Sequence, residues 1–141
     1  MLMPDVNILV YAHRAERPEH LRYAKWLTEL VAGPEPFALS EPVLQSFVRV
    51  VTNPRIYTPA STVQEAFGFL EQLLALPRCL LIRPGPEHWA ILQTLCKLPG
   101  VRGYLVADAA HAALAIESGC EWVTADTDFA RFAPLLRWVH L

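Results

Sequence analysis

The sequence predicts an α/β domain with a central, mostly parallel sheet of short strands. Two observations indicate this fold. Short apolar runs alternate with longer segments that have apolar residues at helical spacing, and acidic residues follow several of the apolar runs. No internal repeat or low-complexity segment interrupts the alternation, and 141 residues are enough to bury a sizeable core. We therefore expect residues 1–141 to form a single domain.

The first segments are predicted to be a very short strand and two helices. Met1–Pro4 is the expected strand, and Asp5–His13 forms the turn and helix that follow it. Pro18–Val31 is expected to be an amphipathic helix that ends at Gly33. Its apolar face is predicted to contain Leu21, Ala24, Leu27 and Leu30.

The middle of the chain is predicted to hold a second strand and two more helices. Pro36–Leu39 is the strand, and Ser40 is the expected N-cap of a helix that stops before Asn53. Another helix is expected over Thr62–Leu76, where Glu65 has the position of a capping-box partner.

The last third of the chain continues the alternation. Cys79–Ile82 is expected to be a buried strand and Glu87–Leu98 a helix. A long Ala-rich helix then follows a loop and ends at Gly119. The remaining segments are predicted to be a strand, a short helix and a last strand: Glu121–Thr124, Asp126–Phe132 and Leu136–His140.

The composition places the protein among intracellular proteins with an apolar interface. Hydrophobic residues make up 53% and charged residues 18%, below the roughly 25% typical of globular chains, which predicts apolar surface in a subunit or partner interface. The net charge of −2 excludes a uniformly basic nucleic-acid-binding protein and still allows a local arginine cluster. Three cysteines without metal-pair spacing indicate a reducing compartment.

Targeting and membrane signals are not expected in this sequence. The N-terminus lacks the basic region of a signal peptide, and polar residues interrupt its apolar stretch. The most apolar long stretch, Tyr104–Ile116, is too short to span a bilayer and contains Asp108 and His111. We therefore predict a cytoplasmic protein with no membrane association.

Three acidic residues are expected at one edge of the sheet. Asp5 follows the first strand directly, and Glu41 and Asp126 each follow a strand by one residue. Ligands of open α/β sheets bind beyond the carboxyl ends of the strands, so these side chains should lie close together. Each acid alone has an ordinary alternative role, because an acid in the first turn of a helix stabilises unpaired N–H groups.

Asp108 favours a metal site over simple capping. It is expected inside the Ala-rich helix, where a buried carboxylate is unfavourable unless a partner compensates its charge. Crowded carboxylates also repel one another unless a cation is present, and oxygen ligands suit Mg²⁺ or Mn²⁺ rather than zinc. Two such ions can activate a water and stabilise the leaving oxygen of a phosphodiester. These residues predict metal-assisted hydrolysis of a nucleic-acid backbone.

Four ordered blocks of the sequence resemble the PIN-domain ribonucleases, and within them the VapC toxins of prokaryotic toxin–antitoxin pairs. The resemblance runs from end to end of the chain. The matching blocks are Pro4–His13, Ser40–Leu44 with its extension Arg49–Pro54, Leu105–Ala109, and Val123–Phe129.

The resemblance implies a PIN-like three-layer α/β/α domain with Mg²⁺-dependent endoribonuclease activity on RNA. It also implies the toxin role in a type II pair, with a VapB-type antitoxin as partner, and the apolar composition fits a homodimer. The residues that match the family's catalytic acids are Asp5, Glu41, Asp108 and Asp126. The candidate metal ligands are Asp5, Asp108, Asp126 and Asp128, where Asp128 is a second candidate for the last acidic position.

Two further residues are expected to support the acids. Thr124 resembles the family's hydroxyl that buttresses the pocket, and Asn7 has the position to hydrogen-bond an acid or a water. Ordinary alternatives are a strand threonine and a helix-start asparagine. Val6 departs from the family, which often has a small hydroxyl residue after the first Asp.

Other polar residues have weaker predictions. His111 lies on the same helical side as Asp108 and is either a general base, a substrate contact or a structural histidine. One or two arginines are expected to meet RNA phosphates, from the set Arg14, Arg49, Arg55, Arg83 and Arg102.

Two other functions compete with the nuclease. A non-catalytic metal- or RNA-binding module of the same fold would use the acids only as caps or structural ligands. A phosphotransfer protein needs a lysine near the carboxylates, and Lys25 and Lys97 both lie on expected helices away from the strand ends. The sequence therefore favours the nuclease.

Overall fold

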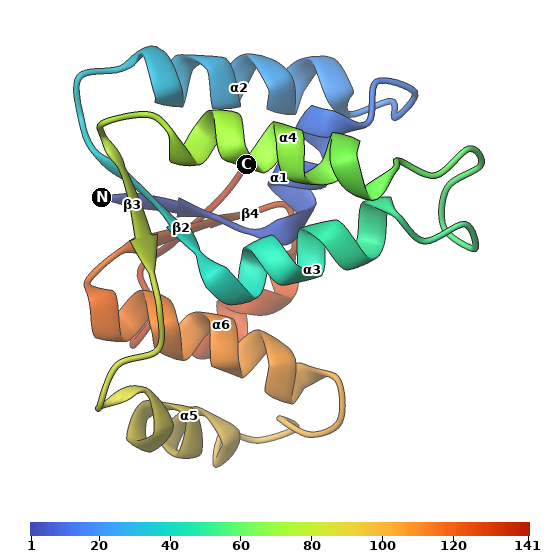
Figure 1. The fold of residues 1–141 in the computed structure, drawn as a ribbon. Helices are drawn as coiled ribbons and strands as arrows, with labels where there is room; N and C mark the ends of the chain where they lie inside the picture. Colours follow the sequence, from blue (N-terminus) through green and yellow to red (C-terminus); the bar gives the residue numbers. More distant parts are fainter.

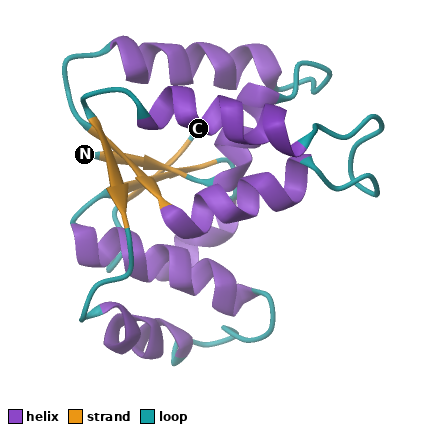
Figure 2. Cartoon of the chain, viewed as in Figure 1, coloured by secondary structure: helices purple, strands orange, loops and turns teal.

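A computed structural model describes residues 1–141 and contains a five-stranded sheet. All paired strands are parallel, in the order β3-β2-β1-β4-β5 (Figures 1 and 2). The strands are β1 (Leu2–Pro4), β2 (Phe37–Ser40), β3 (Cys79–Ile82), β4 (Glu121–Thr124) and β5 (Trp138–His140). The first strand in the sequence, β1, is therefore the central strand of the sheet, between β2 and β4.

Helices cover both sides of the sheet. In Figure 1, α2 and α4 lie above the strands and α5 and α6 lie below them, while α1 packs against both α2 and α3. The helices are α1 (Val6–His13), α2 (His20–Ala32), α3 (Glu41–Val51), α4 (Val63–Leu74), α5 (His88–Cys96) and α6 (Leu105–Ser118), with a 3-10 helix, η1, over Thr127–Phe132. The predicted three-layer α/β/α architecture is confirmed.

Local sequence signals set the ends of two helices as expected. Thr62 is the N-cap of α4 and forms a complete capping box with Glu65, because each side chain bonds the other residue's backbone N–H. Helix α6 ends at Gly119, whose φ of +67° lies in the left-handed region that glycine adopts without strain.

The core lies on both faces of the three central strands. One cluster of 29 buried residues joins strand residues such as Met3, Phe37 and Trp122 to helix residues such as Phe47 and Phe129. The central strands β1 and β2 are buried throughout except at Leu2, so the sheet edge beside Asp5 is fixed by the packing of the whole domain.

Two local predictions were wrong: the burial of Leu21 and the burial of β3. Leu21 is 81% exposed because α2 begins at His20 and turns Tyr23 and Leu27 toward the core. Strand β3 is not buried, because it is an edge strand with one neighbour and Leu80 is 45% exposed. Ser40 occupies the N-cap position of α3, but its buried hydroxyl makes no hydrogen bond.

No helix in the structure is both long and apolar enough to cross a membrane.

Gly119→Ala should lower the free energy of unfolding by about 1–2 kcal/mol, because a Cβ is strained at this positive φ. Gly68→Ala is the matched control: it lies within α4, a Cβ there meets nothing within 4 Å, and it should stabilise the protein by about 0.5–1 kcal/mol. Urea unfolding measures both. Equal effects of the two substitutions would contradict the assignment of Gly119 as the end of α6.

Candidate active site

Asp5 is a buried carboxylate at the carboxyl end of β1. Its backbone N–H donates to the carbonyl of Val123 at 2.8 Å, which extends the pairing of β1 with β4. The side chain is the N-cap of α1, where Oδ1 accepts from the Val6 N–H at 2.6 Å. The second oxygen, Oδ2, accepts from Thr124 Oγ1 at 2.6 Å and from Asn7 Nδ2 at 3.0 Å. With only 6% of the residue exposed, Asp5 has a single fixed orientation.

Asn7 and Thr124 connect the two strand ends, and both make the contacts that were expected of them. Asn7 Nδ2 also donates to Thr124 Oγ1 at 3.2 Å, and Asn7 Oδ1 accepts from the Ala125 N–H at 3.2 Å. The Asp126 N–H donates to Thr124 Oγ1 at 3.0 Å. The hydroxyl that supports Asp5 therefore comes from β4, and Val6 contributes only its backbone N–H.

Asp5, Asp108 and Asp126 line one cleft with a volume of about 480 Å³. Of the three acids expected at one sheet edge, Asp5 and Asp126 share this cleft, and Asp108 joins them from α6. The side chains that share the cleft include Asn7, Tyr11, Arg17, Arg49, Tyr57 and His111.

Burial and mutual repulsion make two of these acids harder to ionise. Burial raises the pKa of Asp5 to about 6, and the charges of Asp108 and Asp126 add to this rise, while the hydrogen bonds from Thr124 and Val6 oppose it. Burial also raises the pKa of Asp108, with further contributions from Asp126 and Asp128. The cleft therefore holds negative charge that a cation would stabilise.

The position of Asp108 differs from the one predicted. Helix α6 starts at Leu105, so Asp108 lies in its first turn and is half-buried rather than enclosed in the middle of an apolar helix. An acid is favourable near the N-terminus of a helix, so the helix itself does not make Asp108 costly. Partial burial, with a further contribution from the neighbouring acids Asp126 and Asp128, raises the pKa of Asp108.

Glu41 and Asp128 do not line this cleft. Glu41 forms an ion pair with Arg83 and lines a separate groove between α3 and α4, although its backbone lies at the same sheet edge as Asp5. Asp128 is exposed, and its carboxylate lies 3.3 Å from Arg131 Nη2. Its backbone N–H donates to Asp126 Oδ1 at 2.8 Å, so Asp128 supports the orientation of Asp126 from outside the cleft.

The sequence model of the PIN domain matches residues 2–135. The chain belongs to the PIN domain family. Ribonuclease VapC43 of Mycobacterium tuberculosis is 44% identical over 140 residues, which cover 99% of this chain and 95% of that protein. Ribonuclease VapC25 of the same organism is 41% identical over 133 residues, or 94% of each protein.

Solved structures share the PIN-like fold. VapC20 of Mycobacterium tuberculosis, described as a Sarcin-Ricin loop cleaving toxin, has a TM-score of 0.69 at 14% identity and covers 94% of this chain and 95% of its own. VapBC2 from Rickettsia felis, solved bound to a promoter DNA fragment, has a TM-score of 0.68 at 22% identity, with coverages of 98% and 96%. At these identities the likeness shows the fold alone.

The donor set of this PIN domain fits a hard divalent ion. No three acidic, histidine or cysteine side chains form a ready-made ion-binding group. Mg²⁺, however, is usually held by one or two carboxylates and completes its shell with waters and phosphate oxygens. Asp5, Asp108 and Asp126 are the carboxylates that face the cleft, and the raised pKa values of Asp5 and Asp108 reflect charge that such an ion would offset.

His111 is a neutral member of the cleft wall. Its ring stacks on Trp122 with 5.6 Å between centroids, and its Nδ1 is buried without a hydrogen-bond partner. Burial, with a smaller effect of His88, lowers the pKa of His111 to about 4. At neutral pH the imidazole is therefore uncharged, which excludes it as a cationic phosphate contact.

The structure also separates the arginines. Arg49 lines the cleft, whereas Arg83 pairs with Glu41, Arg14 binds Ser61, and Arg55 and Arg102 lie outside the cleft. Sequence reasoning did not identify Arg17, Tyr11 or Tyr57 as cleft residues. These residues lie away from the strand ends, in α1, the α1–α2 loop and the loop after α3. No local sequence pattern indicates that these segments meet at the cleft.

The raised pKa of Asp5 predicts a pH-dependent difference between the wild type and Asp5→Asn without metal. The folded protein holds the Asp5 proton up to about pH 6 and the unfolded chain up to about 3.8, so the wild type loses stability as the pH rises through this window. At about 1.4 kcal/mol per unit, the difference should move by about 3 kcal/mol in favour of Asp5→Asn between about pH 4 and pH 7.

Comparison with the variant is needed because His111 acts in the opposite direction. Its folded pKa lies below 6.5, so its contribution to stability is lost as the pH falls from 6.5 toward 4. Unfolding by denaturant in EDTA measures the difference, in which the effect of His111 cancels. Adding Mg²⁺ should stabilise the wild type more than Asp5→Asn at neutral pH. A difference that stays constant with pH would show that the Asp5 pKa is not raised.

Proposed function

We propose that this PIN domain protein is a VapC-type endoribonuclease that hydrolyses RNA phosphodiesters and acts as the toxin of a type II toxin–antitoxin pair in the cytoplasm. The observation that best supports the proposal is the cleft in which Asp5, Asp108 and Asp126 converge. The identity of 44% to a VapC ribonuclease over almost the whole chain supports the same reaction.

In this proposal the three cleft carboxylates hold Mg²⁺, and Mn²⁺ is an alternative. Such an ion supplies polarisation of the phosphate and activation of a water molecule. Asp5 contributes a fixed oxygen, because its hydrogen bonds to Thr124, Asn7 and Val6 leave no other orientation. Asp108 and Asp126 approach from α6 and from the loop after β4. Hydrolysis on this route leaves 5′-phosphate and 3′-hydroxyl ends.

Glu41 and Asp128 have secondary roles in the proposal. Glu41 reaches the substrate or metal only after it separates from Arg83, and both side chains are solvent-accessible enough to do so, at 39% and 63% exposed. Asp128 acts mainly through Asp126, to which it is bonded, and adds negative charge near Asp108.

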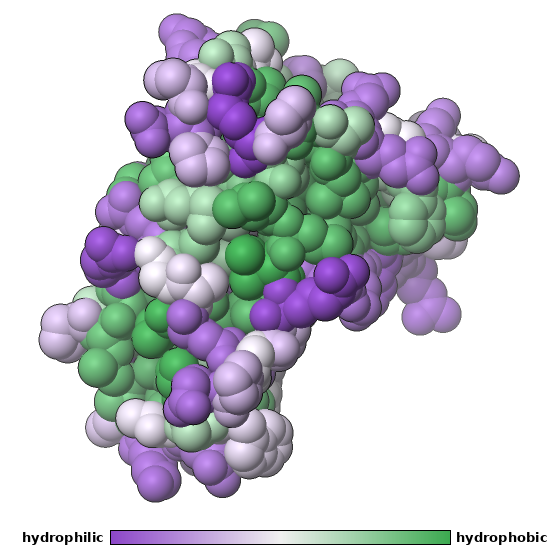
Figure 3. Space-filling model, turned by 60° about the vertical axis from the view of Figure 1, so that its left-hand side comes forward, coloured by the Kyte–Doolittle hydropathy of each residue, from purple (hydrophilic) through white to green (hydrophobic).

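The antitoxin partner has a candidate docking surface beside the active-site edge. An apolar groove of about 380 Å³ runs between α3 and α4 and is lined by Leu44, Val48, Phe67, Leu70 and Leu74. Glu41 also lines it, so the groove starts where α3 leaves the sheet edge. Figure 3 shows hydrophobic surface across the middle of one face of the molecule. We propose that an apolar segment of a VapB-type antitoxin binds this groove, and that the toxin is a homodimer.

Asp5→Asn and Asp108→Asn should each lower RNA cleavage in Mg²⁺ by about 100-fold or more, because metal stabilisation of the reacting phosphate is worth several kcal/mol. Asp128→Asn is the matched control outside the cleft and should lose less than about 10-fold. Cleavage rates and growth arrest on induction measure the effect. Full activity of Asp5→Asn and Asp108→Asn would refute the mechanism. Thermal protection by Mg²⁺ with no cleavage by the wild type would favour a non-catalytic module of the same fold.

Phe67→Asp should weaken the complex with the VapB-type antitoxin, because it places a charge in the apolar groove where Phe67 is 48% exposed. RNA cleavage should stay within about twofold of the wild type, since the groove is separate from the cleft. Co-purification and inhibition of cleavage by the antitoxin measure this. Trp89→Asp on α5, at 67% exposed, is the control for surface charge. Unchanged inhibition of Phe67→Asp would place the antitoxin elsewhere.

A further inference from the structure

The cleft has a second wall that the metal chemistry does not use. Unlike the three aspartates, which are acidic, the residues of this wall are mainly aromatic and cationic. They come from α1, the α1–α2 loop, α3 and the loop after α3. Its residues are Tyr11, Arg17, Arg49, Ile56 and Tyr57. One cavity therefore offers carboxylates together with guanidinium groups and aromatic rings that come from other elements of the fold.

The two arginines of this wall are available to an anion. Arg49 is exposed and makes no hydrogen bond or ion pair with any other residue. Arg17 has one acidic neighbour, Glu19, at 3.2 Å, and its Nε is buried without a partner. Its guanidinium lies 5.2 Å from the centre of the Tyr11 ring, which limits its orientation. Cations placed along one side of a nuclease cleft are suited to phosphates that flank the reacting one.

The Tyr57 ring lines the cleft and also contacts the Arg14 guanidinium. The Arg14 guanidinium lies 4.4 Å from the centre of the Tyr57 ring, and Arg14 itself does not line the cleft. Arg14 therefore packs on the Tyr57 ring without lining the cleft, whereas Tyr57 itself lines the cleft. An aromatic ring in this position is a platform on which an unpaired base can stack.

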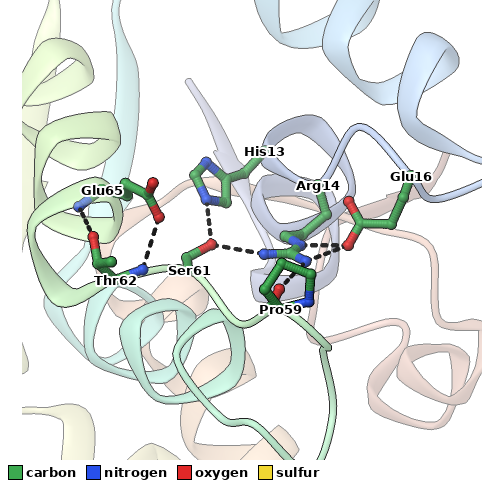
Figure 4. A network of polar contacts seen from close by, with 7 residues as sticks. All are labelled: His13, Arg14, Glu16, Pro59, Ser61, Thr62 and Glu65. Atoms are coloured by element: carbon green, nitrogen blue, oxygen red, sulfur yellow. Dashed lines mark hydrogen bonds and ion pairs between the residues drawn. The ribbon is translucent and has the colours of Figure 1, made fainter.

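A network of hydrogen bonds joins Arg14 to the loop that contains Tyr57 (Figure 4). Arg14 donates from Nη1 to Ser61 Oγ at 2.9 Å and from Nη2 to the Pro59 carbonyl at 2.8 Å. His13 Nε2 lies 2.9 Å from the same Ser61 oxygen, and the Ser61 N–H donates to the Val51 carbonyl at 2.9 Å. The loop between α3 and α4 is thus bonded to the end of α1 on one side and to the end of α3 on the other.

This network has a positioning function rather than a catalytic one. The distance from His13 to Ser61 resembles that of a nucleophile and its base. Ser61, however, is only 7% exposed, and its oxygen accepts a hydrogen bond from Arg14. Neither Ser61 nor His13 lines the cleft, so a substrate bound there does not reach them.

We propose that the second wall is a nucleotide subsite next to the scissile phosphate, in which Tyr57 stacks on an unpaired base and Arg17 and Arg49 contact flanking phosphates. Arg14 is a positioning residue that orients Tyr57 through the Ser61 network. This subsite rests on the proposed ribonuclease function, and it selects single-stranded segments, because a paired base does not leave its helix to meet the ring.

Measuring RNA binding without cleavage tests the subsite separately from the nuclease activity. In the Asp108→Asn background, the affinity for a fluorescein-labelled single-stranded RNA of mixed sequence is compared between Tyr57→Leu and Tyr57→Phe. Tyr57→Phe keeps the ring and should bind within about twofold of the background, whereas Tyr57→Leu should lose about 5- to 100-fold. Affinity for a duplex of the same sequence should not change. Equal binding by the leucine and phenylalanine variants, or an equal loss for duplex RNA, overturns the stacking role.

Salt dependence tests the arginines. Arg49→Gln should lower the slope of log affinity against log salt by about 0.7, the value for one phosphate contact on a single strand. Arg102→Gln is the control, because Arg102 is exposed and lies outside the cleft. An unchanged slope in Arg49→Gln overturns the phosphate contact.

A double-mutant cycle tests the positioning role of Arg14. Arg14→Gln should weaken single-stranded RNA binding in the presence of Tyr57 and have no further effect in the Tyr57→Leu background. Equal losses in both backgrounds would mean that Arg14 acts independently of Tyr57. The outcome is also distinct from failure of the proposed function: a wild type that binds single-stranded RNA through Tyr57 and cleaves none refutes the nuclease and leaves the subsite in place.

Discussion

An ionised carboxylate that is almost fully enclosed is stable only while its oxygens accept hydrogen bonds, and Asp5 meets this condition with donors from two strand ends. The Thr124 hydroxyl is central to this arrangement. It donates a hydrogen bond to Asp5 and accepts hydrogen bonds from the Asn7 side chain and from the Asp126 N–H. The need to satisfy one buried charge thus sets the geometry of the loop that presents Asp126. The parallel pairing of β1 and β4 places these groups within reach of one another.

The charge of the cleft is divided rather than uniform. A net charge of −2 gives no hint of nucleic-acid binding, yet the cleft combines three carboxylates with two arginines. Burial and neighbouring acids raise the pKa values of Asp5 and Asp108, while burial keeps His111 neutral, so that it adds no charge to the cleft. The cleft therefore offers both acidic and cationic groups to a substrate that carries phosphates and bases.

Sequence reasoning succeeded where function follows from the local end of a strand. Asp5 follows β1 directly and Asp126 follows β4 by one residue, so the parallel sheet alone brings them together. It failed where the direction of a side chain depends on a distant residue. Glu41 has the right backbone position, but Arg83, 42 residues away, draws its carboxylate toward another groove. Tyr57 was missed because a loop between helices has no periodic pattern, and its ring packs on Arg14, which is distant in the sequence.

The hydrogen bond from Thr124 to Asp5 joins residues that are 119 positions apart in a chain of 141. A ribosome must therefore synthesise the chain as far as Thr124 before the hydrogen bond that supports Asp5 can form. Until then β1 lacks β4, and the nascent chain has neither the central pairing nor the cleft. The active site is thus assembled only after β4 and Asp126 have been synthesised, and products truncated before β4 lack the site.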